Sequence, residues 1–251
     1  MKKNNIAFTF ATAEVSRIGQ LFIMIVELLT GKLKLKKLYD QYLSENRPPE
    51  YFWDDAVTKL KLTIITNFQE GSYIPKEGKL IVIANHAFGV ADGVSICSVI
   101  SKVRQDYKMV THKVLRQADA VKDKILPIDF NETKEALLTN INTRKEAEKF
   151  LKNDGVIILF PSGRIATKKN LRKYTKADDG DWKQWVSKLI LKTKSPVLPI
   201  YFDGQNSQWY HMANKLGLTF RYSLCMYELK RKIGDDIYMY FGSLISYENL
   251  A

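Results

Sequence analysis

The sequence has little cysteine and little histidine. Its 251 residues include two cysteines and three histidines. Cys97 and Cys225 lie far apart, and neither has a Cys or His neighbour at a metal-ligand interval, which argues against a disulfide framework and a zinc ribbon. His86, His112 and His211 form no pair with ligand spacing, so no metal site is predicted. This cysteine usage favours a reducing, cytoplasmic setting.

A long hydrophobic run is also missing. The most apolar stretch, residues 18–29, has only twelve residues and contains Gln20 and Glu27, whereas a spanning helix needs roughly 20 apolar residues. A secretory signal peptide fits poorly, because Glu14 and Arg17 precede the apolar stretch and no small-residue cleavage site follows it. We therefore expect neither a membrane span nor a cleaved leader.

Positively charged residues are in excess in the sequence. Lys and Arg number 39 against 27 Asp and Glu, a formal net charge of +12, which points to nucleic acid, a membrane surface or phosphorylated ligands as partner. Residues 164–194 contain ten Lys or Arg against three Asp. The aromatic residues follow apolar patterns instead of alternating with these basic residues, and no recognition motif appears, so no nucleic-acid partner is predicted.

Two helices are predicted before residue 50. Apolar residues recur at helical spacing over residues 15–29, and Thr30–Gly31 is expected to end that helix. A second helix over residues 32–43 has one apolar face, formed by Leu35, Leu38, Tyr39 and Tyr42, surrounded by lysines. Two interpretations stay open: a segment lying in a membrane interface, or a helical hairpin packed on the core with its lysines in solvent.

The remaining chain alternates between short apolar strands and helical patterns. Strands are expected near residues 60–64, 80–84, 109–110, 156–160 and 197–202, with helices near 93–103, 133–152 and 181–193. This alternation is typical of an α/β domain with a largely parallel sheet covered by helices. No internal repeat or low-complexity linker occurs, so we expect a helical extension over residues 1–50 and one α/β domain over residues 51–251.

Polar residues follow the second of these strands, where ligands bind in such sheets. Asn85 and His86 come directly after residues 80–84, and Asp92 follows six residues after His86 in a loop that contains Gly89. A histidine that removes a proton needs a partner to fix its tautomer and stabilise its charged form. His86 and Asp92 are therefore a candidate base and its orienting group.

Three other loops occupy equivalent positions after strands. The segment 160–164, Phe-Pro-Ser-Gly-Arg, follows one strand, and Arg164 in this turn is suited to bind a phosphate or a carboxylate. Thr111-His112-Lys113 ends another strand, and residues 202–207 follow the last one, where Asn206 and Ser207 are candidates to line a cleft.

These segments resemble the glycerolipid, or lysophospholipid, acyltransferase family, and within it the bacterial hemolysin-like and ornithine-lipid branch. Asn85-His86 to Asp92 looks like the family's His-to-Asp motif. Residues 160–164 resemble its acceptor motif, and residues 196–199 resemble its third block. The order and spacing of the three blocks agree across roughly residues 15–245.

The sequence departs from the family pattern at two points. The family motif has four residues between His and Asp, whereas five separate His86 from Asp92. The acceptor block usually carries Glu before its Gly, where this chain has Ser162. The second change removes a carboxylate that could contact a glycerol or organise Arg164, which argues against glycerol-3-phosphate as acceptor.

The resemblance implies transfer of a fatty acyl group from acyl-CoA or acyl carrier protein to a hydroxyl of an anionic lysolipid: a lysophosphatidic acid, a lyso-amino-acid lipid or a lysophospholipid. In this reading His86 is the general base oriented by Asp92, and no cofactor is needed. The residues expected to bind substrate are Asn85, Lys113, Ser162, Gly163 and Arg164.

The basic residues then favour an anionic membrane surface and the donor's phosphates as partners. We expect a peripheral or monotopic protein at the cytoplasmic face of the cell membrane. A serine hydrolase is disfavoured because Ser162 lacks the Gly-x-Ser-x-Gly elbow. A catalytically inactive lipid-binding relative of the family is the alternative.

Overall fold

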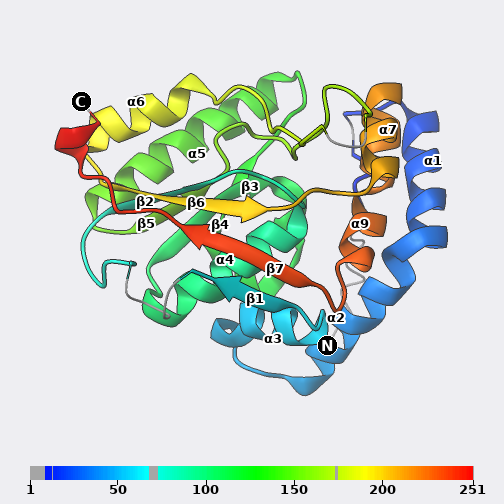
Figure 1. The fold of residues 1–251 in the computed structure, drawn as a ribbon, viewed down its shortest axis with the longest axis horizontal. Coiled ribbons are helices and arrows are strands. Elements are labelled where there is room, and N and C mark those ends of the chain that lie inside the picture. Colours follow the sequence, from blue (N-terminus) through cyan, green and yellow to red (C-terminus); the bar gives the residue numbers. More distant parts are fainter. Residues whose placement is uncertain (1–8, 13, 68–72, 173–174, 251) are drawn as a thin grey trace.

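A seven-stranded sheet organises the chain, of which the computed structural model describes residues 9–12, 14–67, 73–172 and 175–250. The strand order is β1-β7-β6-β2-β5-β3-β4 (Figure 1). The strands are β1 (Thr63–Thr66), β2 (Leu80–Ala84), β3 (Tyr107–His112), β4 (Ile125–Ile128), β5 (Val156–Leu159), β6 (Val197–Asp203) and β7 (Asp236–Phe241). Neighbouring strands are parallel except for the pair β6 and β7. The predicted largely parallel sheet is confirmed.

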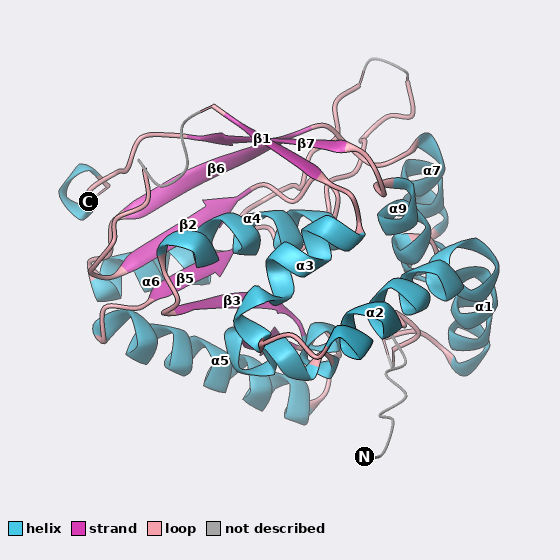
Figure 2. Cartoon of the chain, turned by 90° about the horizontal axis from the view of Figure 1, so that it is seen from below, coloured by secondary structure: helices cyan, strands magenta, loops and turns pink. Residues whose placement is uncertain are grey.

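Helices cover both faces of this sheet (Figures 1 and 2). One face packs against α3 (Phe52–Lys59) and α4 (Val90–Val103), and the other against α5 (Lys134–Lys152) and α6 (Gln184–Thr193). Along β2, Leu80 and Val82 belong to the core on the α4 side, and Ile81 and Ile83 to the core on the α5 side. Because both faces of β2 are buried, its sequence is a continuous apolar run.

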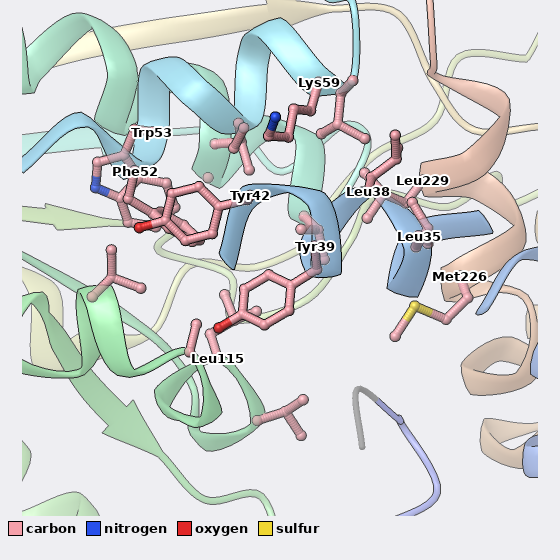
Figure 3. A pocket seen from close by; sticks show the side chains of 18 of the residues that line it. Leu35, Leu38, Tyr39, Tyr42, Phe52, Trp53, Lys59, Leu115, Met226 and Leu229 are labelled. Atoms are coloured by element: carbon pink, nitrogen blue, oxygen red, sulfur yellow. The ribbon is translucent and has the colours of Figure 1, made fainter. Parts of the chain in front are cut away.

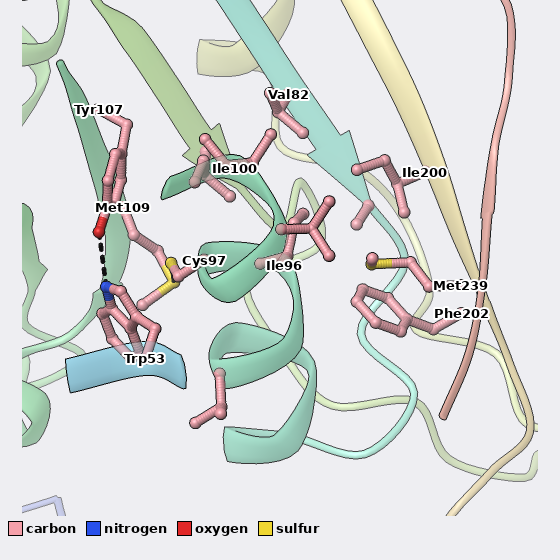
Figure 4. Close-up of a cluster of buried hydrophobic side chains, with 14 of the residues drawn as sticks. Trp53, Val82, Ile96, Cys97, Ile100, Tyr107, Met109, Ile200, Phe202 and Met239 are labelled. Carbon is pink, nitrogen blue, oxygen red and sulfur yellow. Dashed lines mark hydrogen bonds between the residues drawn. The ribbon is translucent and has the colours of Figure 1, made fainter. Parts of the chain in front are cut away.

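The core on the α4 side also fixes α3 against the sheet (Figure 4). The indole N–H of Trp53 donates to the hydroxyl of Tyr107 over 2.6 Å, so the one polar atom that this large side chain buries is satisfied. The Cys97 sulfur lies 3.7 Å from the Met109 sulfur, and burial raises the pKa of this thiol. Cys97 is therefore a packing residue.

The other helices gather at the end of the sheet where β6 ends (Figure 1). They are α1 (Arg17–Glu27), α2 (Leu33–Glu45), α7 (Gln208–Leu216), α8 (Leu218–Ser223) and α9 (Cys225–Arg231). The chain leaves β6 and passes through α7, α8 and α9 at this same end, so β7 runs back antiparallel to β6. Short helical turns complete the fold at η2 (Pro49–Tyr51), η3 (Lys113–Gln117), η4 (Asp119–Lys124) and η5 (Tyr247–Asn249).

One strand prediction needs correction, and two strands were not predicted. The strand expected at residues 60–64 begins at Thr63, because Lys61 adopts a left-handed φ of 50° that turns the chain out of α3. The pattern analysis missed β4, an edge strand that contains Pro127, a residue that argues against a central strand. It also missed β7, where buried and exposed residues alternate.

The predicted end of the first helix at Thr30–Gly31 is wrong. The helix continues from α1 through a π-helical stretch, η1 (Leu28–Lys32), directly into α2. A Cβ on Gly31 would lie 2.6 Å from the carbonyl oxygen of Met226 in α9. Gly31 therefore allows two helix backbones to approach closely.

The two halves of this continuous helix differ in where their large apolar side chains lie. In α2, Leu35, Leu38 and Tyr39 pack against the core, as one of the two interpretations predicts. The hairpin in that interpretation is wrong, because α1, η1 and α2 form one continuous helix. In α1 the inward positions are Gly19, Ile23 and Glu27, whereas the large apolar side chains point outward. The exposed apolar face of α1 and η1 consists of Ile18, Leu21, Phe22, Met24, Ile25, Leu28 and Leu29. Within the described chain, no helix has the length and hydropathy to cross a membrane.

Gly31→Ala tests the close contact between η1 and α9. In an unconstrained helix this change stabilises by about 1 kcal/mol. Here the new methyl group meets the Met226 carbonyl, so we expect a loss of about 1–3 kcal/mol in the free energy of unfolding, measured by urea denaturation. Lys34→Ala, at an exposed position of α2, is the control and should have little effect. A variant as stable as wild type would contradict the packing role of Gly31.

Candidate active site

His86 and Asp92 form a hydrogen-bonded pair at the carboxyl end of β2. Nδ1 of His86 lies 2.8 Å from Oδ2 of Asp92, and the Asp92 side chain is fully buried. With Nδ1–H directed at a carboxylate, Nε2 keeps its lone pair for accepting a proton. The geometry is that of an oriented general base.

The five residues between His86 and Asp92 are accommodated by the start of α4. Asp92 is the third residue of this helix, and its Oδ2 also accepts the amides of Phe88 (2.8 Å) and Gly89 (3.0 Å). Gly89 has φ 89°, a conformation that side-chain-bearing residues rarely adopt. The loop after His86 therefore turns back at Gly89, and the His86–Asp92 pair forms although five residues separate the two.

The surroundings of His86 fix both its ring and its backbone. The imidazole stacks on Phe160, with ring centroids 4.1 Å apart and an interplanar angle of 22°. The carbonyl of His86 accepts the amide of Ala166 over 2.7 Å. The side chain remains 18% exposed, so it is accessible while being held.

The other two histidines have different settings. His112 places Nε2 2.9 Å from the Glu14 carboxylate, and its Nδ1 accepts the amide of Val114. Both ring nitrogens are thus occupied, so His112 is a poor base. His211 is fully buried, and burial together with the charge of Lys168 lowers its pKa. In the described part of the chain, no group of three or more His, Cys, Asp or Glu side chains is placed to hold a metal ion.

The predicted acceptor turn follows β5 and lies next to His86. The hydroxyl of Ser162 is buried and bonds the carbonyl and amide of Arg164, so it shapes the turn from within. Gly163 has φ 71°. Nε of Arg164 donates to the carbonyl of Asp179 over 3.2 Å, and a Cβ on Gly180 would lie 2.4 Å from Nη2 of Arg164. The guanidinium is therefore supported by the backbone at residues 179–180.

Asp179 places a carboxyl group next to this turn, although it lies outside the motif at residues 160–164. Its side chain is buried beside the Ser162 hydroxyl and the backbone of His86. Burial raises the pKa of Asp179, although hydrogen bonds from Ser162 and from the His86 backbone oppose the rise. No local sequence signal marks this residue, because long-range folding brings it beside Ser162.

Two predicted substrate-binding residues are engaged within the protein. Nζ of Lys113 lies 2.7 Å from Oδ2 of Asp129, so its charge is partly balanced. The Asn85 side chain bonds both the amide and the carbonyl of Phe202, which ties the end of β2 to β6. Their binding of substrate stays a prediction, as does that of Ser162, Gly163 and Arg164.

His86 lines a wide cleft of about 1360 Å³. One end of the cleft reaches α8 and the N-terminal segment, and the other reaches α5 and α6. Pattern analysis missed several residues that line it: Glu14, Phe130, Arg144, Trp185, Arg221 and Tyr222. They come from elements far apart in the sequence and share no motif.

An apolar cavity adjoins this cleft under α2 (Figure 3). Its walls come from α2, α3, η3 and α9, with Tyr39, Trp53 and Leu115 among the lining residues. Val90, Gly93 and Leu115 line both the cavity and the cleft. The cavity, of about 150 Å³, therefore opens close to the start of α4, which follows the loop that carries His86.

The fold and this site together define a class of protein. A histidine oriented by an aspartate lies at the carboxyl edge of a parallel sheet, next to the turn that carries Arg164 and an apolar cavity. The model of the family described as Acyltransferase matches residues 65–203, more than half of the chain. The chain belongs to the acyltransferase family.

Two curated proteins are similar in sequence to part of this chain. The chain is 25% identical over 159 residues to a lyso-glycine lipid O-acyltransferase of Phocaeicola vulgatus. It is 27% identical over 165 residues to a protein of the same name from Bacteroides thetaiotaomicron. Each alignment covers 60% of this chain but 53% and 54% of the relatives. The chain thus spans about half the length of the curated relatives it matches.

A solved structure supports the fold. The crystal structure of the 1-acyl-sn-glycerophosphate (LPA) acyltransferase PlsC from Thermotoga maritima superposes with a TM-score of 0.50 and 18% sequence identity. The match covers 90% of this chain and 77% of that chain. At this identity the likeness shows a shared fold.

Asp179→Asn tests the environment of the buried carboxyl. Because the pKa of Asp179 is raised from its ordinary value of 3.8, its ionisation costs stability as the pH rises through the folded-state pKa. We expect the asparagine variant to gain stability relative to wild type between pH 4 and pH 8, and the gain to vanish in acid. Thermal melting across this range measures it.

Asp178→Asn is the matched control, and its effect on stability is expected to have the opposite sign. The Gly180 amide lowers the pKa of Asp178, so this variant should lose stability relative to wild type near neutral pH and approach it in acid. If the stability difference between Asp179→Asn and wild type does not change with pH, the pKa of Asp179 is not raised.

Proposed function

We propose that the protein is a lysolipid O-acyltransferase that uses His86 as general base and an acyl thioester as donor. The observation that carries this proposal is the His86–Asp92 pair, 2.8 Å apart, facing a cleft that borders an apolar cavity. The family membership and the names of both relatives agree with it.

The chemistry follows from the geometry of the pair. The acceptor hydroxyl attacks the thioester carbonyl carbon while Nε2 of His86 takes its proton, and Asp92 stabilises the imidazolium that forms. A C–O bond forms, the C–S bond breaks, and the departing thiolate receives the proton. The Ser162 hydroxyl bonds its own turn, so the mechanism uses no covalent acyl-serine.

The apolar cavity under α2 is suited to the acyl chain of the donor. It is walled by leucines and aromatic rings (Figure 3), which favour a hydrocarbon chain over water. Since Val90 and Gly93 of α4 line both spaces, a chain in the cavity places its thioester carbonyl beside His86.

For the acceptor we propose a lyso-amino-acid lipid. The names of both relatives specify a lyso-glycine lipid, and glycine linked through its nitrogen presents a carboxylate. Arg164 is the predicted partner of that carboxylate. Lys113 already pairs with Asp129, so its charge is less available for a second negative charge on a dianionic phosphate.

The outer surface near the cleft is suited to a membrane interface. Ile18 is 83% exposed and Leu29 is 78% exposed on α1 and η1. Phe22 contacts Phe220 of α8 with ring centroids 5.3 Å apart. The neighbouring helix α7 exposes Trp209 and Leu216. Apolar patches of this kind mark binding surfaces. We propose peripheral attachment through this face, at the cytoplasmic side of the membrane as the sequence predicts.

Acyl transfer with a panel of acceptors tests the activity. Purified protein is mixed with acyl-CoA or acyl carrier protein and with lyso-glycine lipid, lysophosphatidic acid or a lysophospholipid, and products are identified by mass spectrometry. We expect the largest rate with lyso-glycine lipid. No product with any donor and acceptor would favour the inactive lipid-binding alternative.

His86→Ala and Asp92→Asn assign the chemistry. Both should fall below about one hundredth of the wild-type rate, because the first removes the base and the second removes the charge that stabilises its protonated form. Asp123→Asn, at an exposed position on η4, is the control and should keep full activity. Circular dichroism and melting show whether each variant is folded. Near-normal activity of folded His86→Ala would rule out this mechanism.

Vesicle flotation tests the apolar face of α1. The double variant Ile18→Ser/Leu29→Ser removes exposed apolar area without touching the core, so its binding should drop on neutral and anionic vesicles alike. Lys34→Ser/Lys37→Ser keeps the apolar face and should reduce binding to anionic vesicles only. Equal binding by wild type and the Ile18/Leu29 variant would show that this face does not contact lipid.

A further inference from the structure

Three cations line the end of the cleft that is formed by α5 and α6. Arg144 lies on α5, Lys183 immediately precedes α6, and Lys188 lies on α6. The guanidinium carbon of Arg144 is 5.8 Å from the ring centroid of Trp185, which lines the same part of the cleft. We call these three residues the α5–α6 cations.

No acidic partner balances the α5–α6 cations. Within the described residues, none of the three makes an ion pair, although Glu132 and Asp181 also line the cleft. Neighbouring lysines do have partners: Lys169 is paired with Asp178 and Lys192 with Glu148. Several unpaired positive charges on a concave surface attract an anionic ligand.

The layout of the cleft indicates which ligand uses this end. Leu218, Arg221 and Tyr222 of α8 form the opposite end, next to the exposed apolar face of α1 and η1. A lipid acceptor held at a membrane reaches His86 from that side. The polar part of a donor whose acyl chain occupies the cavity under α2 must leave by the other side, toward α5 and α6.

We propose that the α5–α6 cations bind the phosphate group on the donor's 4′-phosphopantetheine arm. Acyl-CoA and acyl carrier protein share this phosphate, as part of a diphosphate in CoA and of a phosphodiester in the carrier protein, so the site serves either donor. The assignment rests on the proposed function and adds to it a location for the donor's charged end. Lysine and arginine suit this role because both form charge-assisted hydrogen bonds to phosphate oxygens.

Binding of CoA itself tests the site without any turnover. Isothermal titration compares wild type with Arg144→Gln/Lys188→Gln, the two cations that lie within α5 and α6. We expect the dissociation constant for CoA to rise at least about tenfold, which corresponds to about 1.4 kcal/mol. The control Lys145→Gln/Lys149→Gln removes the same charge from exposed positions of α5 outside the cleft lining and should bind CoA as wild type does.

Kinetics with matched donors separate phosphate recognition from a general effect. With acyl-CoA, Arg144→Gln/Lys188→Gln should raise KM for the donor and leave kcat and the acceptor KM unchanged. With acyl-pantetheine, which lacks the phosphate, the variant and wild type should be equal. The same loss with both donors, or no loss with acyl-CoA, would overturn the proposal.

The two sources of the 4′-phosphate are distinguished by one more comparison. A loss with acyl-4′-phosphopantetheine equal to that with acyl-CoA supports recognition of the shared phosphate. A loss that appears with acyl carrier protein but not with acyl-4′-phosphopantetheine overturns it in favour of contact with the carrier protein's surface. If wild type forms no product with any donor, the proposed function fails, and the titration with CoA still decides whether the α5–α6 cations bind phosphate.

Discussion

The Asp92 carboxylate is the interaction on which the site depends. One of its oxygens accepts His86 and the amides of Phe88 and Gly89. It thus begins α4, closes the loop after β2 and orients the imidazole at the same time. Its burial excludes water from this network, which strengthens each of these bonds. Start of helix, loop shape and catalytic geometry cannot be changed separately here.

The parallel sheet explains why the other functional groups meet at this point. The loops after β2, β5 and β6 leave the same edge, so Asn85 ties the end of β2 to β6, and Phe160 at the end of β5 stacks on His86. The described residues of 164–172 and 175–181 then return to the site. Their backbone holds the His86 carbonyl through Ala166 and supports the Arg164 guanidinium. The buried Asp179 also places a carboxyl group beside Ser162, the position at which the acceptor motif usually carries Glu.

Much of this arrangement could be predicted from the sequence because it depends on local patterns. The buried runs of β2, β5 and β6 are continuous and apolar, and His86 and Asp92 follow a strand at a spacing that a helix start can close. What escaped prediction depends on long-range contact. Gly31 reads as a helix end, yet it lies in the helix because α9 packs against it. Arg221, Tyr222 and Asp179 carry no motif, and only the fold brings them to the cleft.

The unbroken run from α1 through η1 into α2 has a geometric consequence. One half presents apolar side chains outward, and the other half walls the cavity under α2. Because backbone hydrogen bonds continue along the helix, the two halves keep a constant angle to each other. Any planar surface on which α1 rests therefore sets the direction from which a chain can enter the cavity. One continuous helix therefore couples the orientation of the exposed apolar face to the orientation of the cavity wall.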